Sequence, residues 1–113
     1  MSLDKNKIGI LGGSFDPAHR GHLTISKEAA KRFKLKKIIW AITKKNPFKK
    51  ESKKSLDERI RNCKKIIGKI AFIKVKFYEG IIRSNKTINL INYFAKNKRN
   101  EIYFLMGADN LIN

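Results

Sequence analysis

The sequence has few of the residues that brace a small domain covalently or through a zinc ion. It contains one cysteine, Cys63, among 113 residues. A single cysteine cannot form an intrachain disulfide, and it excludes a zinc site built from several cysteines. This cysteine usage fits a reducing compartment, and we expect the protein to be cytoplasmic.

Long uncharged apolar segments are missing as well. No stretch approaches the roughly 18 apolar residues that a membrane-spanning helix needs. We therefore expect no association with the membrane interior. No change in composition divides the chain, so we predict a single domain over residues 1–113.

Acidic residues are scarce. Nine Asp and Glu stand against 27 Lys and Arg, which gives a formal net charge of +18. Such a charge favours polyanionic partners, including nucleotides, nucleic acids and acidic membrane surfaces. However, the basic residues are mostly lysines spread over nearly every segment, whereas phosphate-reading proteins tend to use arginine and interleaved aromatics. We therefore expect no specific nucleic-acid binding.

Apolar segments alternate with amphipathic ones along the chain. Continuous or alternating apolar runs predict strands at 8–11, 38–42, 70–77 and 101–106. Apolar residues at helical spacing predict helices at 21–34, 56–67 and 88–95, with Ser55 and Thr87 as N-caps. In the last helix we expect Ile88, Ile91 and Ala95 on one face, with Leu90 and Phe94 beside it. We expect residues 79–86 to form a loop.

The predicted order β-α-β-α-β-α-β indicates an α/β fold with a Rossmann-like parallel sheet, right-handed crossovers and helices on both faces. Gly107 follows the fourth strand, and Asp109 or Asn110 would cap a further helix, yet the sequence stops at Asn113. We therefore expect the C-terminal part of the fold to be missing, and the last strand to lack part of its cover.

The most informative segment is GGSFDPAHRGH at residues 12–22. It follows the first apolar run and leads into the first helical pattern, so it predicts a loop between a buried strand and a helix N-terminus. Glycines allow close approach of the backbone to a ligand, and the first helical amides with the helix dipole attract phosphate. His19 and His22 lie at the same helix start and can donate hydrogen bonds to phosphate oxygens.

Two common phosphate loops are excluded here. The Gly-x4-Gly-Lys-Ser/Thr and Gly-x-Gly-x-x-Gly patterns are both absent. The His-x-x-His spacing could ligate a metal, but there is no third histidine and no cysteine pair beside it. We therefore predict no metal site formed by protein side chains.

The same segment resembles the signature loop of the bacterial nicotinate mononucleotide adenylyltransferases, which belong to the nucleotidylyltransferase superfamily with a Thr/His-x-Gly-His motif. Residues 46–49, 58–59 and 106–109, which read NPFK, ER and MGAD, are similar in order to further family segments. The family's C-terminal Ile-Ser-Ser-Thr-x-x-Arg segment has no counterpart. The resemblance thus covers the front part of the family's catalytic domain.

The resemblance implies transfer of the AMP moiety of ATP to nicotinate mononucleotide, giving deamido-NAD and pyrophosphate, with Mg²⁺ carried by ATP. It implies that His19 and His22 are catalytic, with His22 beside the α-phosphate. The residues implied to bind ATP and its phosphates are Gly12, Gly13, Ser14, Phe15, His19, Gly21, His22, Gly107 and Asp109. Those implied to bind the mononucleotide are Asp16, Lys49 and Thr87.

Two other interpretations remain open. A sister enzyme such as phosphopantetheine adenylyltransferase shares the superfamily loop, although the Gly-Gly-Ser frame with His19 favours the nicotinate enzyme. Alternatively, the chain is a catalytically silent fragment that binds polyanions without specificity. For Asp109 and Thr87, helix capping is an equally good explanation, and Lys49 could be a solvated surface residue. We expect the 113-residue chain alone to bind ATP weakly and to turn over little.

Overall fold

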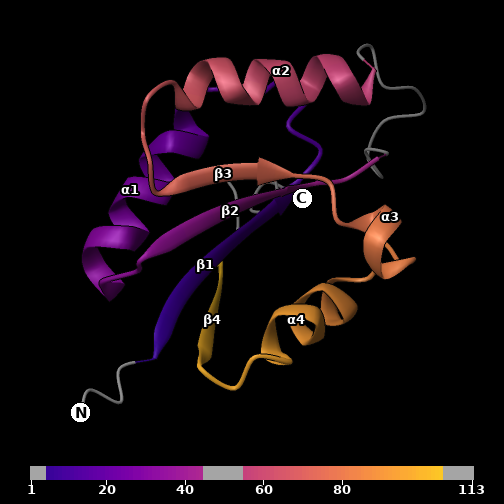
Figure 1. The fold of residues 1–113 in the computed structure, drawn as a ribbon. Helices are drawn as coiled ribbons and strands as arrows, with labels where there is room; N and C mark the ends of the chain where they lie inside the picture. Colours follow the sequence, from indigo (N-terminus) through magenta and orange to yellow (C-terminus); the bar gives the residue numbers. More distant parts are fainter. Residues whose placement is uncertain (1–4, 45–54, 106–113) are drawn as a thin grey trace, which may run out of the picture.

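Four apolar segments form one parallel β-sheet in the computed structural model, which describes residues 5–44 and 55–105 (Figure 1). The strand order is β3-β2-β1-β4, and each neighbouring pair is parallel. This confirms the predicted Rossmann-like α/β class. The strands are β1 (Asn6–Gly13), β2 (Lys37–Ile42), β3 (Ile73–Lys76) and β4 (Asn100–Leu105).

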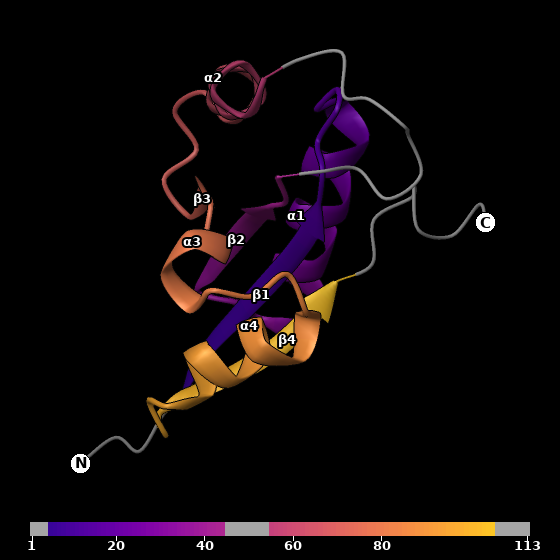
Figure 2. The same ribbon diagram turned by 90° about the vertical axis from the view of Figure 1, so that its right-hand side faces the viewer.

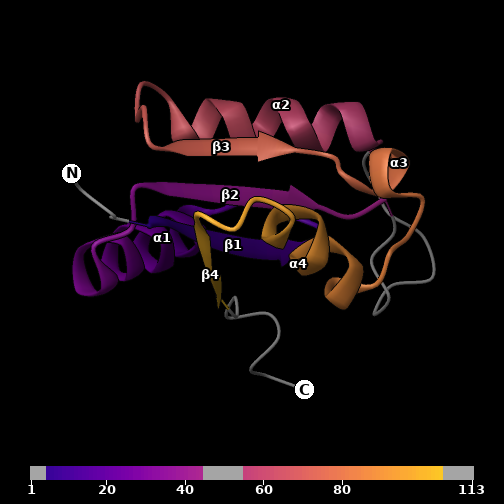
Figure 3. The ribbon, with the colours of Figure 1, turned by 60° about the horizontal axis from the view of Figure 1, so that its bottom comes forward.

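Helices cover both faces of the sheet, as predicted. Helices α1 and α2 lie on one side, and α4 lies on the other, with the short α3 between β3 and α4 (Figures 2 and 3). In the part of the chain that the structure describes, no helix has the length and apolar character to cross a membrane. The helices are α1 (Arg20–Phe33), α2 (Leu56–Ile67), α3 (Glu79–Ile82) and α4 (Thr87–Ala95).

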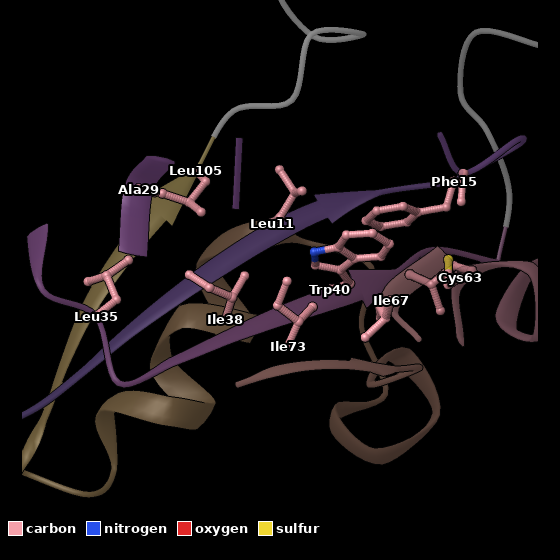
Figure 4. Packing of buried hydrophobic residues seen from close by; sticks show 12 residues of the cluster. Leu11, Phe15, Ala29, Leu35, Ile38, Trp40, Cys63, Ile67, Ile73 and Leu105 are labelled. Atoms are coloured by element: carbon pink, nitrogen blue, oxygen red, sulfur yellow. The ribbon is translucent and has the colours of Figure 1, made fainter. Parts of the chain in front are cut away.

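The alternation of side chains along the strands divides the core between the two faces. Ile8, Ile10, Ile39 and Ala41 face α4, where Leu90, Phe94 and Tyr78 pack against them. The larger cluster faces α1 and α2, and its centre is Trp40, which is fully buried (Figure 4). Other members of this cluster are Leu11, Phe15, Ala29, Leu35, Ile38, Cys63, Ile67, Ile73 and Leu105.

Three local expectations need correction. Strand β3 covers only 73–76 of the predicted 70–77, because the chain needs residues 68–72 to turn back from the end of α2, where Gly68 has a φ of 59°. The predicted loop at 79–86 contains α3, a single turn whose amides at Ile81 and Ile82 donate to the Tyr78 carbonyl. Helix α4 begins after Lys86, so Thr87 is its first residue and not its N-cap.

The prediction that Ile88 and Ala95 lie at the centre of the buried face of α4 is wrong, and the residues expected beside that face make the contact. Leu90 and Phe94 contact the sheet, whereas Ile88 is 59% exposed and Ala95 is exposed. The prediction for α2 fares better: Ser55 Oγ accepts a hydrogen bond from the Glu58 amide at 3.2 Å, and Cys63 and Ile67 are buried. Ser55 is therefore the N-cap that the sequence predicted.

Candidate active site

The predicted phosphate loop begins at the end of the central strand. Gly12 and Gly13 close β1 opposite Ala41 and Ile42 of β2, and the Thr43 amide donates to the Gly13 carbonyl at 2.8 Å. Parallel strands bring their carboxyl ends to one edge of the sheet, which is where ligands bind in open α/β folds. The loop that follows, residues 14–19, therefore starts at the edge expected for a ligand.

Phe15 anchors this loop in the core. Its side chain is 1% exposed, although its backbone has a φ of 51°, a left-handed conformation that is uncommon for a bulky residue. The ring stacks on Trp40 with centroids 5.0 Å apart and planes 13° apart (Figure 4). Burial of the ring holds a backbone conformation that the residue would not choose alone, so the loop has one preferred shape.

The two histidines cap the start of α1 reciprocally. His19 Nδ1 accepts from the Gly21 amide at 3.1 Å, and His22 Nδ1 accepts from the His19 amide at 3.0 Å. The two rings lie with centroids 4.1 Å apart, His22 buried and His19 exposed. This is the pattern of a capping box in which imidazoles replace the usual hydroxyl and carboxylate.

Reciprocal capping fixes which nitrogen of each ring carries the proton. A nitrogen that accepts a hydrogen bond from a backbone amide is unprotonated, so in the neutral ring the proton is on Nε2. Both histidines therefore carry an Nε2–H donor on the edge of the ring away from the cap. Donors of this kind, spaced along a helix start, suit phosphate oxygens.

Gly21 makes room for the His19 ring. A Cβ at this position would lie 2.7 Å from His19 Cε1 and 2.8 Å from its Nδ1, closer than atoms pack. The ring lies directly over the backbone of Gly21, and any larger residue would push it away. The glycine between the two histidines is thus required by the geometry of the cap.

Two buried hydrogen bonds link Trp40 to the backbone of His22 through Ser26. Trp40 Nε1 donates to Ser26 Oγ at 2.8 Å, and Ser26 Oγ donates to the His22 carbonyl at 2.8 Å. Phe15 also lies against the His22 ring, with centroids 4.6 Å apart. The two hydrogen bonds thus hold the His22 backbone, and the imidazole itself packs against Phe15 and lies near Trp40, with centroids 5.7 Å apart.

Sequence reasoning assigned no role to Arg59, which the structure places under the loop. Its side chain is 1% exposed. Nη1 donates to the Ser14 carbonyl at 2.9 Å and to the Thr43 carbonyl at 2.7 Å, and Nη2 donates to the Lys44 carbonyl at 2.6 Å. A signal was available, because Arg59 lies four and eight residues before the buried Cys63 and Ile67 and so shares their face of α2.

Glu79 contacts the segment after β2, where its Oε1 accepts a hydrogen bond from the Lys44 amide at 2.7 Å.

The Cys63 thiol is not a nucleophile at neutral pH. Burial, opposed by the positive charge of Arg59, raises its pKa from 9.0 to about 12, so this cysteine stays protonated. Neither Glu79 nor Cys63 was a predicted site residue.

Most of the predicted phosphate-binding residues lie in one stretch that runs from the last residues of β1 to the first turn of α1. Asp16 belongs to the same loop and is partly exposed. Thr87 is exposed at the start of α4, and no hydrogen bond joins it to this loop within 5–44 and 55–105. Lys49, Gly107 and Asp109 lie outside the described residues. Across the described ranges, no three His, Cys, Asp or Glu side chains gather as metal ligands would.

Comparison with known proteins identifies the family. The cytidylyltransferase-like family model matches residues 10–113, which is most of the chain. The chain belongs to this family. A probable nicotinate-nucleotide adenylyltransferase of Pelagibacter ubique is 70% identical over all 113 residues, which make up 63% of that protein. A probable enzyme of the same name from Agrobacterium fabrum is 37% identical over 106 residues, which cover 92% of this chain and 56% of that protein.

The family fold is also found among solved structures. The crystal structure of a Vibrio parahaemolyticus protein, named as a putative nicotinate-nucleotide adenylyltransferase, superimposes with a TM-score of 0.68. The match covers 94% of this chain and 63% of that one at 17% identity. This chain thus spans 63%, 56% and 63% of the length of these three proteins, less than two thirds in each case.

Proposed function

We propose that this chain carries the ATP-phosphate half of an adenylyltransferase that transfers AMP from MgATP to nicotinate mononucleotide, releasing pyrophosphate and deamido-NAD. The observation that carries the proposal is the reciprocal histidine cap, which holds two adjacent imidazoles at the start of α1 with each Nδ1 bonded to a backbone amide. The name shared by the Pelagibacter and Agrobacterium relatives supports the choice of substrate.

The proposed reaction needs no covalent intermediate with the protein. The attacking 5′-phosphate oxygen of the mononucleotide is already ionised at neutral pH, so no activated serine or cysteine is needed. What the protein must supply is alignment of two polyanions and stabilisation of the charge on the transferred phosphoryl group. Mg²⁺ enters as part of the MgATP substrate, and it keeps most of its water ligands when it does so.

His22 and His19 divide this work. We place His22 beside the α-phosphate, because its ring is buried against Phe15 and its Nδ1 accepts from the His19 amide, and a fixed donor costs no reorganisation as charge develops. The exposed His19 contacts the outer phosphates. The amides of Gly13, Ser14 and Phe15 complete the phosphate cradle, as the resemblance implies.

The remaining contacts follow from the family resemblance. Asp16, Lys49 and Thr87 are proposed to face the mononucleotide, and Gly107 and Asp109 to face the ATP ribose and phosphates. We propose that the reaction takes place in the cytoplasm, which fits the single buried and unpaired Cys63.

The test measures pyrophosphate release from MgATP with three acceptors: nicotinate mononucleotide, nicotinamide mononucleotide and phosphopantetheine. It uses the chain itself, and also the Pelagibacter relative carrying these 113 residues in place of its own matching segment. His22→Ala is expected to lower turnover about 10²-fold or more, the usual effect of losing a transition-state donor. Lys27→Ala, an exposed change on the same helix, is the control and should leave the rate unchanged.

The outcomes separate the alternatives. Release that requires nicotinate mononucleotide and His22 supports the proposal. Pyrophosphate release with phosphopantetheine instead would show that the protein is a phosphopantetheine adenylyltransferase. If neither protein releases pyrophosphate with any acceptor, and RNA binds the chain with steep salt dependence, the silent polyanion-binding fragment is the better description.

A further inference from the structure

Arg59 carries a buried positive charge, and burial of a charge costs free energy. A charged side chain that is 1% exposed loses the hydration of its charge, and Nε has no hydrogen-bond partner within the described ranges. Its three described partners are neutral backbone carbonyls. A buried charge without an ionised partner costs free energy that an apolar side chain would not, so stability alone explains this residue poorly.

The three carbonyls lie at functionally related places. Ser14 belongs to the phosphate loop, whereas Thr43 and Lys44 follow the end of β2. The planar fork of a guanidinium can reach several acceptors at once, which an ammonium cannot do in the same geometry. Arg59 therefore ties the loop after β1 to the segment after β2.

The bond to Ser14 has a consequence for the next amide. In a trans peptide the C=O and the following N–H point in opposite directions. Because the Ser14 carbonyl points at Arg59, the Phe15 N–H points away from the guanidinium. Likewise, the Gly13 carbonyl accepts from the Thr43 amide, so the Ser14 N–H points away from that segment.

We propose that Arg59 is a positioning residue that sets the orientation of the Phe15 amide, and with it the anion-binding form of the loop. Arg59 does not touch the ligand; it acts through the peptide between Ser14 and Phe15. Without the guanidinium, this peptide is free to turn its carbonyl toward the phosphates, which would repel them. This inference rests on the proposed function, since it assumes that phosphate binds at the loop.

The experiment follows the Phe15 amide by NMR while the full 113-residue chain is titrated with inorganic pyrophosphate. The two test variants are Arg59→Lys, which keeps the charge, and Arg59→Met, which keeps the apolar stem. Ile67→Ala controls for destabilisation, because it opens a cavity under the same helix away from the loop. Arg61→Met, on the exposed side of α2, controls for the loss of one positive charge.

We expect both Arg59 variants to bind pyrophosphate about tenfold more weakly, which is the effect of losing one charge-assisted hydrogen bond. We also expect the chemical shift of their Phe15 amide not to respond to pyrophosphate. The two control variants should bind within about twofold of wild type. An unchanged response in Arg59→Lys, or an equal loss in Ile67→Ala, would overturn the inference. So would failure of both Arg59 variants to fold while Ile67→Ala folds, since Arg59 would then serve the core.

Failure of the proposed function gives a different result. If the Phe15 amide of the wild-type chain does not respond to pyrophosphate, the phosphate site itself is wrong, and the role of Arg59 falls with it. If wild type responds and the Arg59 variants respond equally, the phosphate site stands and only the positioning role is lost.

Discussion

Replacing Gly21 by alanine separates the function of the histidine cap from its contribution to stability. The added Cβ would lie 2.7 Å from His19 Cε1 and 2.8 Å from Nδ1. The His19 ring is exposed and can swing outward, so the backbone need not move. The swing breaks the hydrogen bond from the Gly21 amide to His19 Nδ1 and removes the His19 Nε2–H from its place.

The two effects on stability nearly cancel. Loss of an N-cap hydrogen bond costs about 1 kcal/mol, whereas alanine in a helix is favoured over glycine by about 0.8–1.0 kcal/mol. The free energy of unfolding should therefore change by less than about 1 kcal/mol. Catalysis has no such compensation, because a displaced phosphate donor is worth about 10²-fold in turnover. The expected result is a stable protein with a slow reaction.

The assay pairs urea denaturation of the chain, followed by the fluorescence of Trp40, with pyrophosphate release by the Pelagibacter relative carrying these residues. Gly80→Ala is the matched control, since its Cβ would meet only Phe77 at 3.5 Å, an ordinary contact. Turnover of Gly21→Ala within about twofold of the Gly80→Ala rate would refute the reasoning, because the His19 donor would then not matter.

Three further outcomes follow from the same contacts. Nitrogen NMR at neutral pH should show Nδ1 unprotonated and Nε2 protonated in both His19 and His22; an Nδ1–H ring would contradict the reciprocal cap. Ser26→Ala leaves Trp40 Nε1 without its acceptor and should cost about 1–3 kcal/mol in urea denaturation; a loss below about 0.5 kcal/mol would show that another group replaces the hydroxyl. Because the folded thiol of Cys63 keeps its proton to a pKa of about 12 while the unfolded thiol ionises near 9.0, its stabilising contribution is complete below pH 9 and is lost as the pH rises toward 12. Between pH 8 and pH 10 the wild-type chain should lose about 1 kcal/mol more than Cys63→Ala, and equal losses would contradict the raised pKa.

The sequence predicts the parts of the fold whose apolar spacing is unambiguous. The run from Ile38 to Ile42 is continuously apolar, and it forms β2, buried on both faces. In α4, by contrast, apolar residues surround the helix, so spacing could not select a face. Packing on the sheet selects Leu90 and Phe94 and leaves Ile88 exposed. The single turn of α3 is too short to show any periodicity.

In the site, too, local features could be predicted from the sequence and long-range contacts could not. A local motif predicts the loop and both histidines, because the atoms that shape the cap are at most three residues apart. Arg59 could not be assigned a role in this way, since it is 45 residues from Ser14 in sequence and meets it only after α2 has packed on the sheet. Its position on the apolar face of α2 marks it as unusual, but only the folded chain shows that its acceptors are carbonyls of the loop.

The same interactions that build the core also shape the site. Phe15 packs on Trp40 and on His22, and Trp40 reaches the His22 carbonyl through Ser26. A core substitution at Trp40 would therefore move a phosphate donor as well as lower stability, and the two effects would be hard to separate. His19 and Gly21 lie on the exposed side of the cap, where a side chain can change without disturbing the core. For this reason the role of the histidine loop is best tested from its exposed side.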